Sequence, residues 1–188
     1  MLVRSVLLLP FAAFLIAAKA PPAPPPMPSI VAPPEIMANK ADHLFIELSS
    51  GGTVEIVLRP DLAPHHVERI QTLVRQGFYN GLTFHRVIPG FMAQGGDPTG
   101  TGTSGSHLPN LKAEFSDVPH GRGAVSMART SDPHSANSQF FIVFDDATFL
   151  DGQYTLWGEV VGGMEHVDAL PKGEPPRAPG KIVKATIS

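Results

Sequence analysis

The stretch FHRVIPGFMAQGGD, residues 84–97, combines short apolar segments with an arginine and a glutamine. Short strands are expected on both sides of the Pro-Gly pair in this stretch, at residues 83–88 and 91–94. Side chains alternate between the two faces of a strand, which would place Phe84, Arg86 and Ile88 together. From spacing alone, an arginine in such apolar company is most often a barrel-rim residue paired with an acid.

The sequence around this stretch is typical of an all-β domain from Asp42 onward. Residues 44–48 and 54–58 are expected to form a hairpin around the turn Ser50-Gly51-Gly52. Further short strands are expected at residues 124–128, 140–144, 155–161 and 182–187. Many short strands separated by glycine and proline turns predict a mainly β fold, an eight-stranded closed or nearly closed barrel.

Two helices are expected beside the strands. After Pro60, with Asp61 as the expected N-terminal cap, apolar residues recur at helical spacing up to Gly77. These apolar residues are Val67, Ile70, Leu73 and Val74. This helix should pack on the sheet, and a second short helix is expected at residues 163–170.

Composition limits the possible functions. The chain has 188 residues, 43% of them hydrophobic and 16% charged, with a formal net charge of −3. Such a chain can form one domain with a hydrophobic core, and it is not a polybasic nucleic-acid-binding protein. The absence of cysteine excludes disulfides, a thiolate nucleophile and a Cys-rich zinc site.

The first 20 residues have the order of a secretory signal peptide: Arg4, then an apolar run, then Ala18-Lys19-Ala20. The apolar run is interrupted by Pro10 and is shorter than the ~20 residues of a membrane-spanning helix. We therefore expect export to the periplasm. Because Pro21 follows the expected cleavage site, an uncut N-terminal tether to the membrane is the alternative.

Residues 21–41 are expected to form a proline-rich linker ahead of a domain at residues 42–188. Its first part, residues 21–34, reads PPAPPPMPSIVAPP and is expected to be a stiff polyproline-II spacer. The alternative is a proline-rich docking ligand for a partner.

Three patterns that could carry other chemistry are rejected. Residues 100–105 match G-x-G-x-x-G, but no helical period follows them, so residues 95–105 are interpreted as a flexible surface loop rather than a nucleotide site. The eight histidines are scattered, and the adjacent pair His65-His66 would point apart on a helix, so no histidine metal site is expected. A serine triad built on Ser126 or Ser138 lacks a nucleophile-elbow pattern.

The opening stretch and several later motifs together resemble the cyclophilin family of peptidyl-prolyl cis-trans isomerases, over essentially all of residues 42–188. The later motifs are SMAR at 126–129, SQFFI at 138–142, FLDG at 149–152 and WGEV at 157–160. The compact loops are similar to those of the bacterial, exported branch. The resemblance implies an eight-stranded antiparallel barrel closed by two helices, with the substrate groove on its outer face.

The resemblance also implies which residues form the site. Arg86 matches the catalytic arginine and Gln94 the glutamine that binds the substrate backbone. The pocket for the substrate proline ring would consist of Phe91, Met92, Phe141 and Leu150.

Other matching positions depart from the family. Ala128 and Arg129 match a backbone shelf, although the family often has asparagine at the second position. Phe149 stands where eukaryotic members have a tryptophan that helps bind cyclosporin, and Tyr154 stands where they have a histidine. The resemblance therefore implies catalysis but not tight inhibition by that drug.

The expected function is acceleration of rotation about X-Pro bonds in exported proteins, through a donor from Arg86 to the twisted amide. No metal, nucleotide or redox cofactor is required. The expected partners are proline-containing unfolded or partly folded polypeptides, and the protein is expected to be a monomer. One alternative is a non-catalytic chaperone or scaffold of the same fold that binds proline-containing segments. Another is an anchored stalk protein whose proline-rich segment recruits a partner.

Overall fold

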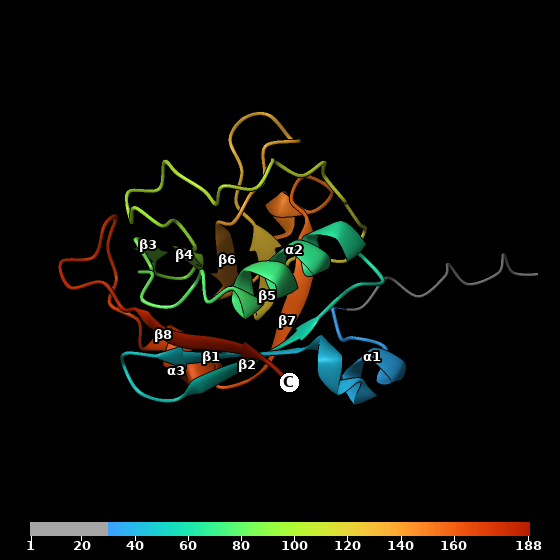
Figure 1. Ribbon diagram of the computed structural model, residues 1–188, viewed down its shortest axis with the longest axis horizontal. Coiled ribbons are helices and arrows are strands. Elements are labelled where there is room, and N and C mark those ends of the chain that lie inside the picture. The colour runs from blue at the N-terminus through green and yellow to red at the C-terminus, as the bar shows by residue number, and fades with distance from the viewer. Residues whose placement is uncertain (1–29) are drawn as a thin grey trace, which may run out of the picture.

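A computed structural model describes residues 30–188, so the expectations for the signal segment and for residues 21–29 lie outside the described residues. Eight antiparallel strands form one curled sheet in the order β3-β4-β6-β5-β7-β2-β1-β8 (Figure 1). Their bounds are β1 His43–Leu48, β2 Thr53–Leu58, β3 Arg86–Ile88, β4 Met92–Gly95, β5 Ala124–Met127, β6 Phe140–Val143, β7 Leu156–Gly162 and β8 Ile182–Ile187. Each of the eight strands lies within two or three residues of a position expected from the sequence.

The expected hairpin is present as β1 and β2, paired from His43 with Val57 to Glu47 with Thr53. Gly51 and Gly52 both have positive φ, of 92° and 84°, which side chains with a Cβ rarely adopt. The glycines therefore allow the tight reversal that places the two strands in register.

The two end strands of the sheet, β3 and β8, do not pair with each other in residues 30–188. The chain just before β3 is joined to the start of β8 by the isolated antiparallel bridge between Thr83 and Lys181 and by backbone hydrogen bonds, among them Phe84 N to Gly180 O at 2.9 Å and Ile182 N to Leu82 O at 2.8 Å. The expectation of a closed barrel is thus not confirmed, and the sheet is a curled half-barrel. One reason is that β3 begins at Arg86, three residues later than expected, which leaves little strand for a second pairing.

Two of the helices are those expected. The first, α2, spans Pro64–Arg75 and packs against β7 and β8, whereas α3, Met164–Asp168, lies beside β2 (Figure 1). The expected apolar positions of α2 are all buried in the main core. A short helix not expected from the sequence, α1, spans Pro34–Ala38, and two short 3-10 helices are η1 (Lys40–Asp42) and η2 (Thr148–Leu150).

Asp61 is not the cap of α2, contrary to expectation. The helix starts three residues later, and the Asp61 carboxylate instead accepts hydrogen bonds from Arg59 Nε and Nη2, at 2.9 and 2.8 Å. The first backbone N–H groups of α2 have no acceptor within the helix and bind a side chain from another segment instead. Glu114 accepts from the backbone N–H groups of His65 and His66 at 3.2 and 3.1 Å. A distant carboxylate therefore caps this helix.

Residues 30–42 pack against the domain. Arg59, a residue only 3% exposed, donates from Nη1 to the carbonyl oxygen of Ile30 at 2.9 Å. The backbone N–H of Ala32 donates to Glu159 Oε2 at 3.1 Å, and Ala32 and Ile36 bury their side chains against Val57. The folded unit thus begins upstream of Asp42, where the sequence analysis placed the start of the domain.

The buried residues divide between two main clusters. The larger one fills the space between the sheet and α2 and includes Trp157 and Phe140. The smaller one contains Met92, Phe141 and Leu150, which also face the site described below. Within residues 30–188, the structure contains no helix with the length and apolar character needed to span a membrane.

Candidate active site

The strand register places Arg86, Gln94 and Phe141 in one row across three neighbouring strands. Arg86 of β3 pairs with Gln94 of β4, and Gln94 pairs with Phe141 of β6. Directly paired residues project from the same face of a sheet. The cation, the amide and the aromatic ring therefore share one face, although they are far apart in sequence.

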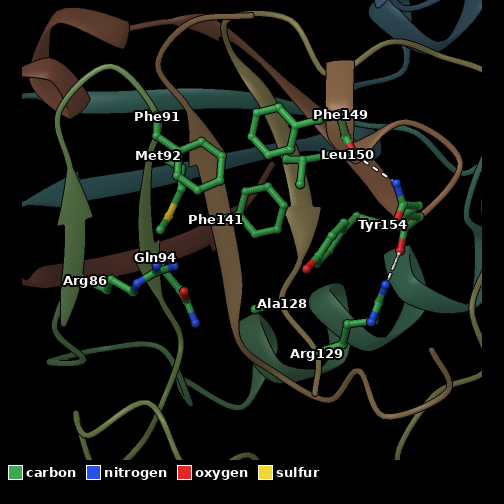
Figure 2. A pocket seen from close by; sticks show the side chains of 11 residues that line it. Arg86, Phe91, Met92, Gln94, Ala128, Arg129, Phe141, Phe149, Leu150 and Tyr154 are labelled. Atoms are coloured by element: carbon green, nitrogen blue, oxygen red, sulfur yellow. Dashed lines mark hydrogen bonds between the residues drawn. The ribbon is translucent and has the colours of Figure 1, made fainter. Parts of the chain in front are cut away.

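This face borders a cavity of about 430 Å³. All ten residues that the resemblance assigns to the site line it: Arg86, Phe91, Met92, Gln94, Ala128, Arg129, Phe141, Phe149, Leu150 and Tyr154. Their arrangement is shown in Figure 2. The structure brings them together, whereas their individual roles remain predictions.

Four aromatic rings form much of the apolar wall of the cavity. Phe91 and Phe149 lie with ring centroids 5.4 Å apart, and Phe141 meets Tyr154 edge to face at 5.6 Å. Phe141 is buried, whereas Phe149 is 64% exposed at the rim. The cavity thus has a fixed apolar floor and an accessible apolar edge, a surface suited to a small aliphatic ring.

Arg86 contributes a positive charge beside this apolar wall. In Figure 2 its side chain extends next to that of Gln94. Arg86 Nε donates to Glu174 Oε2 at 2.7 Å, and among residues 30–188 no acceptor is recorded for its two terminal nitrogens. Arg86 is therefore paired with an acid, as its spacing alone suggested, and it also lines the cavity, while its catalytic role stays a prediction.

Gln94 is held in place by a second glutamine. Its Nε2 donates to Gln139 Oε1 at 2.9 Å, and Gln139 Nε2 in turn donates to the carbonyl oxygen of Ser104 at 2.8 Å. Since Gln94 Nε2 is the donor in this contact, its own amide oxygen stays available to accept a hydrogen bond from a peptide N–H.

Arg129 closes another side of the cavity. Its guanidinium lies 4.5 Å from the centroid of the Tyr154 ring and donates from Nε and Nη2 to the carbonyl oxygen of Gln153, at 3.1 and 2.9 Å. Gln153 also donates from its side chain to the carbonyl oxygen of Phe149 at 3.0 Å. Gln153 lines the cavity and was missed by the sequence analysis, because it binds Arg129 through its backbone carbonyl oxygen, a group that every residue type has.

A second cavity, of about 540 Å³, adjoins the first and shares Gln94, Ala128 and Arg129 with it. Part of its wall is the loop at residues 95–105, which the sequence analysis interpreted as a flexible surface loop. The buried Asp97 carboxylate cross-links this loop by accepting from Thr99 N at 2.7 Å and from Ser104 N at 3.2 Å. The loop is thus a structured wall of the site region.

Phe84 departs from the expected alternation. It is buried in the main core with Val87, whereas Arg86 and Ile88 lie on the side of the cavity. The physical reason is that the chain is not strand between Thr83 and Arg86, so the period of two begins only at Arg86.

The rejected serine triad has a structural counterpart. His120 Nε2 lies 2.8 Å from Ser126 Oγ, and His120 Nδ1 lies 2.9 Å from Asp151 Oδ1. These are the partners of a serine-hydrolase triad, but Ser126 is completely buried in β5 and lines neither cavity. A substrate carbonyl cannot reach this hydroxyl, so Ser126 does not act as a nucleophile. The hydrogen bonds instead connect β5 to the end of η2. Burial lowers the pKa of His120 despite its contact with Asp151.

Comparisons with known proteins agree on one family. The family model described as cyclophilin type peptidyl-prolyl cis-trans isomerase matches residues 43–187. A probable peptidyl-prolyl cis-trans isomerase of Brucella suis is 55% identical over 166 residues, covering 80% of this chain and 84% of the relative. Peptidyl-prolyl cis-trans isomerase B of Bacillus subtilis is 43% identical over 132 residues, covering 69% and 91%.

Solved structures show the same similarity. A cyclophilin from Hirschia baltica superposes with a TM-score of 0.74 at 33% identity, covering 79% of this chain and 74% of its own. A cyclophilin-type isomerase from Cryptosporidium parvum, determined in the presence of the dipeptide Ala-Pro, gives 0.72 at 29% identity and covers 78% and 98%.

Proposed function

The chain belongs to the cyclophilin-type peptidyl-prolyl cis-trans isomerases, and we propose that it accelerates X-Pro bond rotation in exported proteins with Arg86 as the catalytic residue. The ligand class is supported by the Ala-Pro dipeptide described for the Cryptosporidium relative. The observation that carries the role of Arg86 is its position beside an apolar cavity, where its terminal nitrogens have no acceptor among residues 30–188.

The chemistry requires no bond to break. Resonance gives the amide a rotational barrier of about 18–20 kcal/mol, and X-Pro bonds exchange over tens to hundreds of seconds. At the twisted midpoint, the resonance is lost and the lone pair becomes localised on the proline nitrogen. A donor directed at that nitrogen stabilises the twisted state more than either planar isomer, which is the condition for catalysis.

Arg86 suits this task because its guanidinium stays charged and holds its N–H groups in a fixed plane. The Nε contact to Glu174 leaves the terminal N–H groups for the substrate. Loss of one well-placed transition-state donor costs about 10²- to 10³-fold in rate.

The rest of the cavity would hold the two sides of the rotating bond. Phe91, Met92, Phe141 and Leu150 would bind the proline ring, while Gln94 and the backbone near Ala128 hold the flanking peptide. Burial of the ring also removes water from the amide, and a less polar setting weakens the resonance that opposes rotation. One side of the bond is thereby fixed while the other turns.

The test is a prolyl-peptide isomerisation assay with the purified 188-residue chain. Arg86→Ala is expected to lower kcat/KM by about 10²- to 10³-fold. The matched control is Arg122→Ala, because Arg122 is also a surface arginine in an ion pair, with Asp168, but lies outside the cavity. Full activity of Arg86→Ala would contradict the role of the arginine. Binding of proline peptides without acceleration by the unaltered chain would favour the non-catalytic binder.

The proposal that the substrates are exported proteins rests on residues 1–20. Mass spectrometry of the N-terminus from soluble and membrane fractions tests it. A soluble, exported chain beginning near residue 21 supports a cleaved signal, a membrane-bound chain beginning at Met1 supports a tether, and recovery of the full chain from the cytoplasm contradicts export.

A further inference from the structure

We propose that Glu174 is a positioning residue for Arg86, an inference that rests on the proposed catalytic role of that arginine. Glu174 lies outside the cavity lining and belongs to the loop between α3 and β8, 88 residues from Arg86 in sequence. In Figure 1, this loop projects beside β3, which carries Arg86 at its first position.

The loop is attached to β3 by its backbone. Val87 N donates to Gly173 O at 2.8 Å, and Gly173 N donates to Val87 O at 2.9 Å. This reciprocal pair joins the neighbour of Arg86 to the neighbour of Glu174. The two charged side chains are consequently brought into reach by main-chain hydrogen bonds rather than by chance contact on the surface.

Gly173 is needed for this attachment. Its φ is +146°, and a Cβ at this position would come within 2.7 Å of Pro176 Cα and 2.8 Å of the Pro175 carbonyl oxygen. Only a residue without a side chain fits between β3 and the rest of the loop. The position of Glu174 is therefore a defined feature of the fold.

The geometry of the contact determines what Glu174 does to Arg86. A guanidinium is planar, so a hydrogen bond at Nε restricts rotation of the whole group and fixes the direction of the remaining N–H groups. The carboxylate occupies Nε at 2.7 Å and leaves the terminal nitrogens for the substrate. A donor whose orientation is set before the substrate arrives needs less reorganisation in the transition state.

The contact is better suited to orientation than to stability. The side chains of Arg86 and Glu174 are 40% and 53% exposed, and ion pairs exposed to this extent contribute little to folding. The expected consequence of losing Glu174 is therefore a change in turnover with the fold intact.

The experiment compares Glu174→Ala and Glu174→Gln in the 188-residue chain, with kcat and KM measured separately. Glu174→Ala is expected to lower kcat by about threefold to tenfold while KM stays within about twofold, a fraction of the full donor loss. Glu174→Gln retains an acceptor oxygen and is expected to keep activity within about twofold of the unaltered protein.

A spectroscopic measurement follows the contact directly. The ¹⁵N–¹H resonance of Arg86 Nε, assigned by its loss in Arg86→Lys, should shift in Glu174→Ala. The matched control is Asp168→Ala, which removes the similarly exposed ion pair with Arg122. This control should leave both kcat and the Arg86 resonance unchanged.

The outcomes separate this inference from the proposed function. If Arg86→Ala loses activity but Glu174→Ala does not, or gains activity, Glu174 does not position Arg86 and the proposed function stands. An equal loss in Glu174→Gln and Glu174→Ala also overturns the inference. If neither Arg86→Ala nor Glu174→Ala changes the rate, the catalytic role of Arg86 is contradicted, and the positioning role of Glu174 is contradicted with it. Glu174→Ala added to Arg86→Ala should cause no further loss.

Discussion

At the scale of single residues, Phe149 is expected to contribute to substrate binding but little to the stability of the fold. This residue is 64% exposed, yet it lines the cavity and its ring contacts Phe91. Phe149→Ala is expected to change the free energy of unfolding by less than about 0.5 kcal/mol, as for other exposed positions. The substitution should lower kcat/KM about threefold to tenfold, because the aromatic contact that it removes from the substrate is worth about 0.5–1.5 kcal/mol. Urea unfolding and the isomerisation assay measure the two quantities.

Phe115 provides the control for this prediction. It is also an exposed phenylalanine, at 42%, but it does not line the cavity. Phe115→Ala should leave both stability and kcat/KM unchanged. Equal activity of the two alanine variants would show that the exposed rim does not contact the substrate.

At the scale of elements, α2 depends on Glu114. The carboxylate accepts from two backbone N–H groups of the first turn and from His66 Nδ1 at 2.6 Å. Glu114→Ala is expected to lower the free energy of unfolding by about 1–2 kcal/mol, as for loss of a helix cap. Denaturant unfolding measures this change. Asp117→Ala, which removes a nearby exposed acid, is the control, and an equal loss in both variants would argue against the capping role.

The segment at residues 30–42 is a second element whose docking can be measured. Ile36 is 8% exposed and packs with Ala32 against Val57. Ile36→Ala should destabilise the protein by about 2 kcal/mol, at the lower end for a buried isoleucine. Thermal or denaturant unfolding measures the loss, and kcat/KM should stay unchanged because the segment does not line the cavity.

Met37, on the same helix, is the control for that substitution because this residue is 37% exposed. Met37→Ala should have little effect on stability. If Ile36→Ala is equally neutral, the segment contributes nothing to folding and the stable domain begins nearer Asp42.

At the scale of the whole molecule, several buried groups make stability depend on pH in one direction. Burial lowers the pKa of His66, His85 and His120 below the ordinary value of about 6.5. The unfolded chain therefore binds protons near pH 6.5 that the folded protein does not. Their contribution to stability is complete above that pH and is lost as the pH falls.

Two carboxyl groups modify this profile. Burial alone would raise the pKa of Glu114, but hydrogen bonds from His66 and His65 outweigh it and lower the pKa, so its contribution is also lost as the pH falls. Burial raises the pKa of Glu159, whose effect has the opposite sign. Because the three histidines act together, Tm should decrease between pH 8 and pH 5, whereas the contribution of Glu114 is lost only below its ordinary pKa of about 4.5. Calorimetry at constant ionic strength measures it, and a Tm that rises on acidification would contradict the prediction.

The sequence alone determined the mainly β fold, the approximate strands and α2, because these depend on local periodicity and turn residues. Val67, Ile70, Leu73 and Val74 predicted the buried face of α2 correctly, since a helix repeats its face every few residues. The motifs also gathered the ten site residues, which the structure places around one cavity. The alternation of strand residues predicted the wrong face for Phe84, which lies in the core because β3 starts only at Arg86.

Only the tertiary structure decided the contacts between distant segments. Glu114 rather than Asp61 caps α2, Glu174 reaches Arg86, and Gln153 holds Arg129. The extent of barrel closure and the docking of residues 30–42 belong to the same class. Each depends on where the chain returns after tens of residues, and local preferences carry no information about that separation. Hydrophobic periodicity specifies which face of an element is buried, whereas the partner on that face is selected by packing of the whole chain.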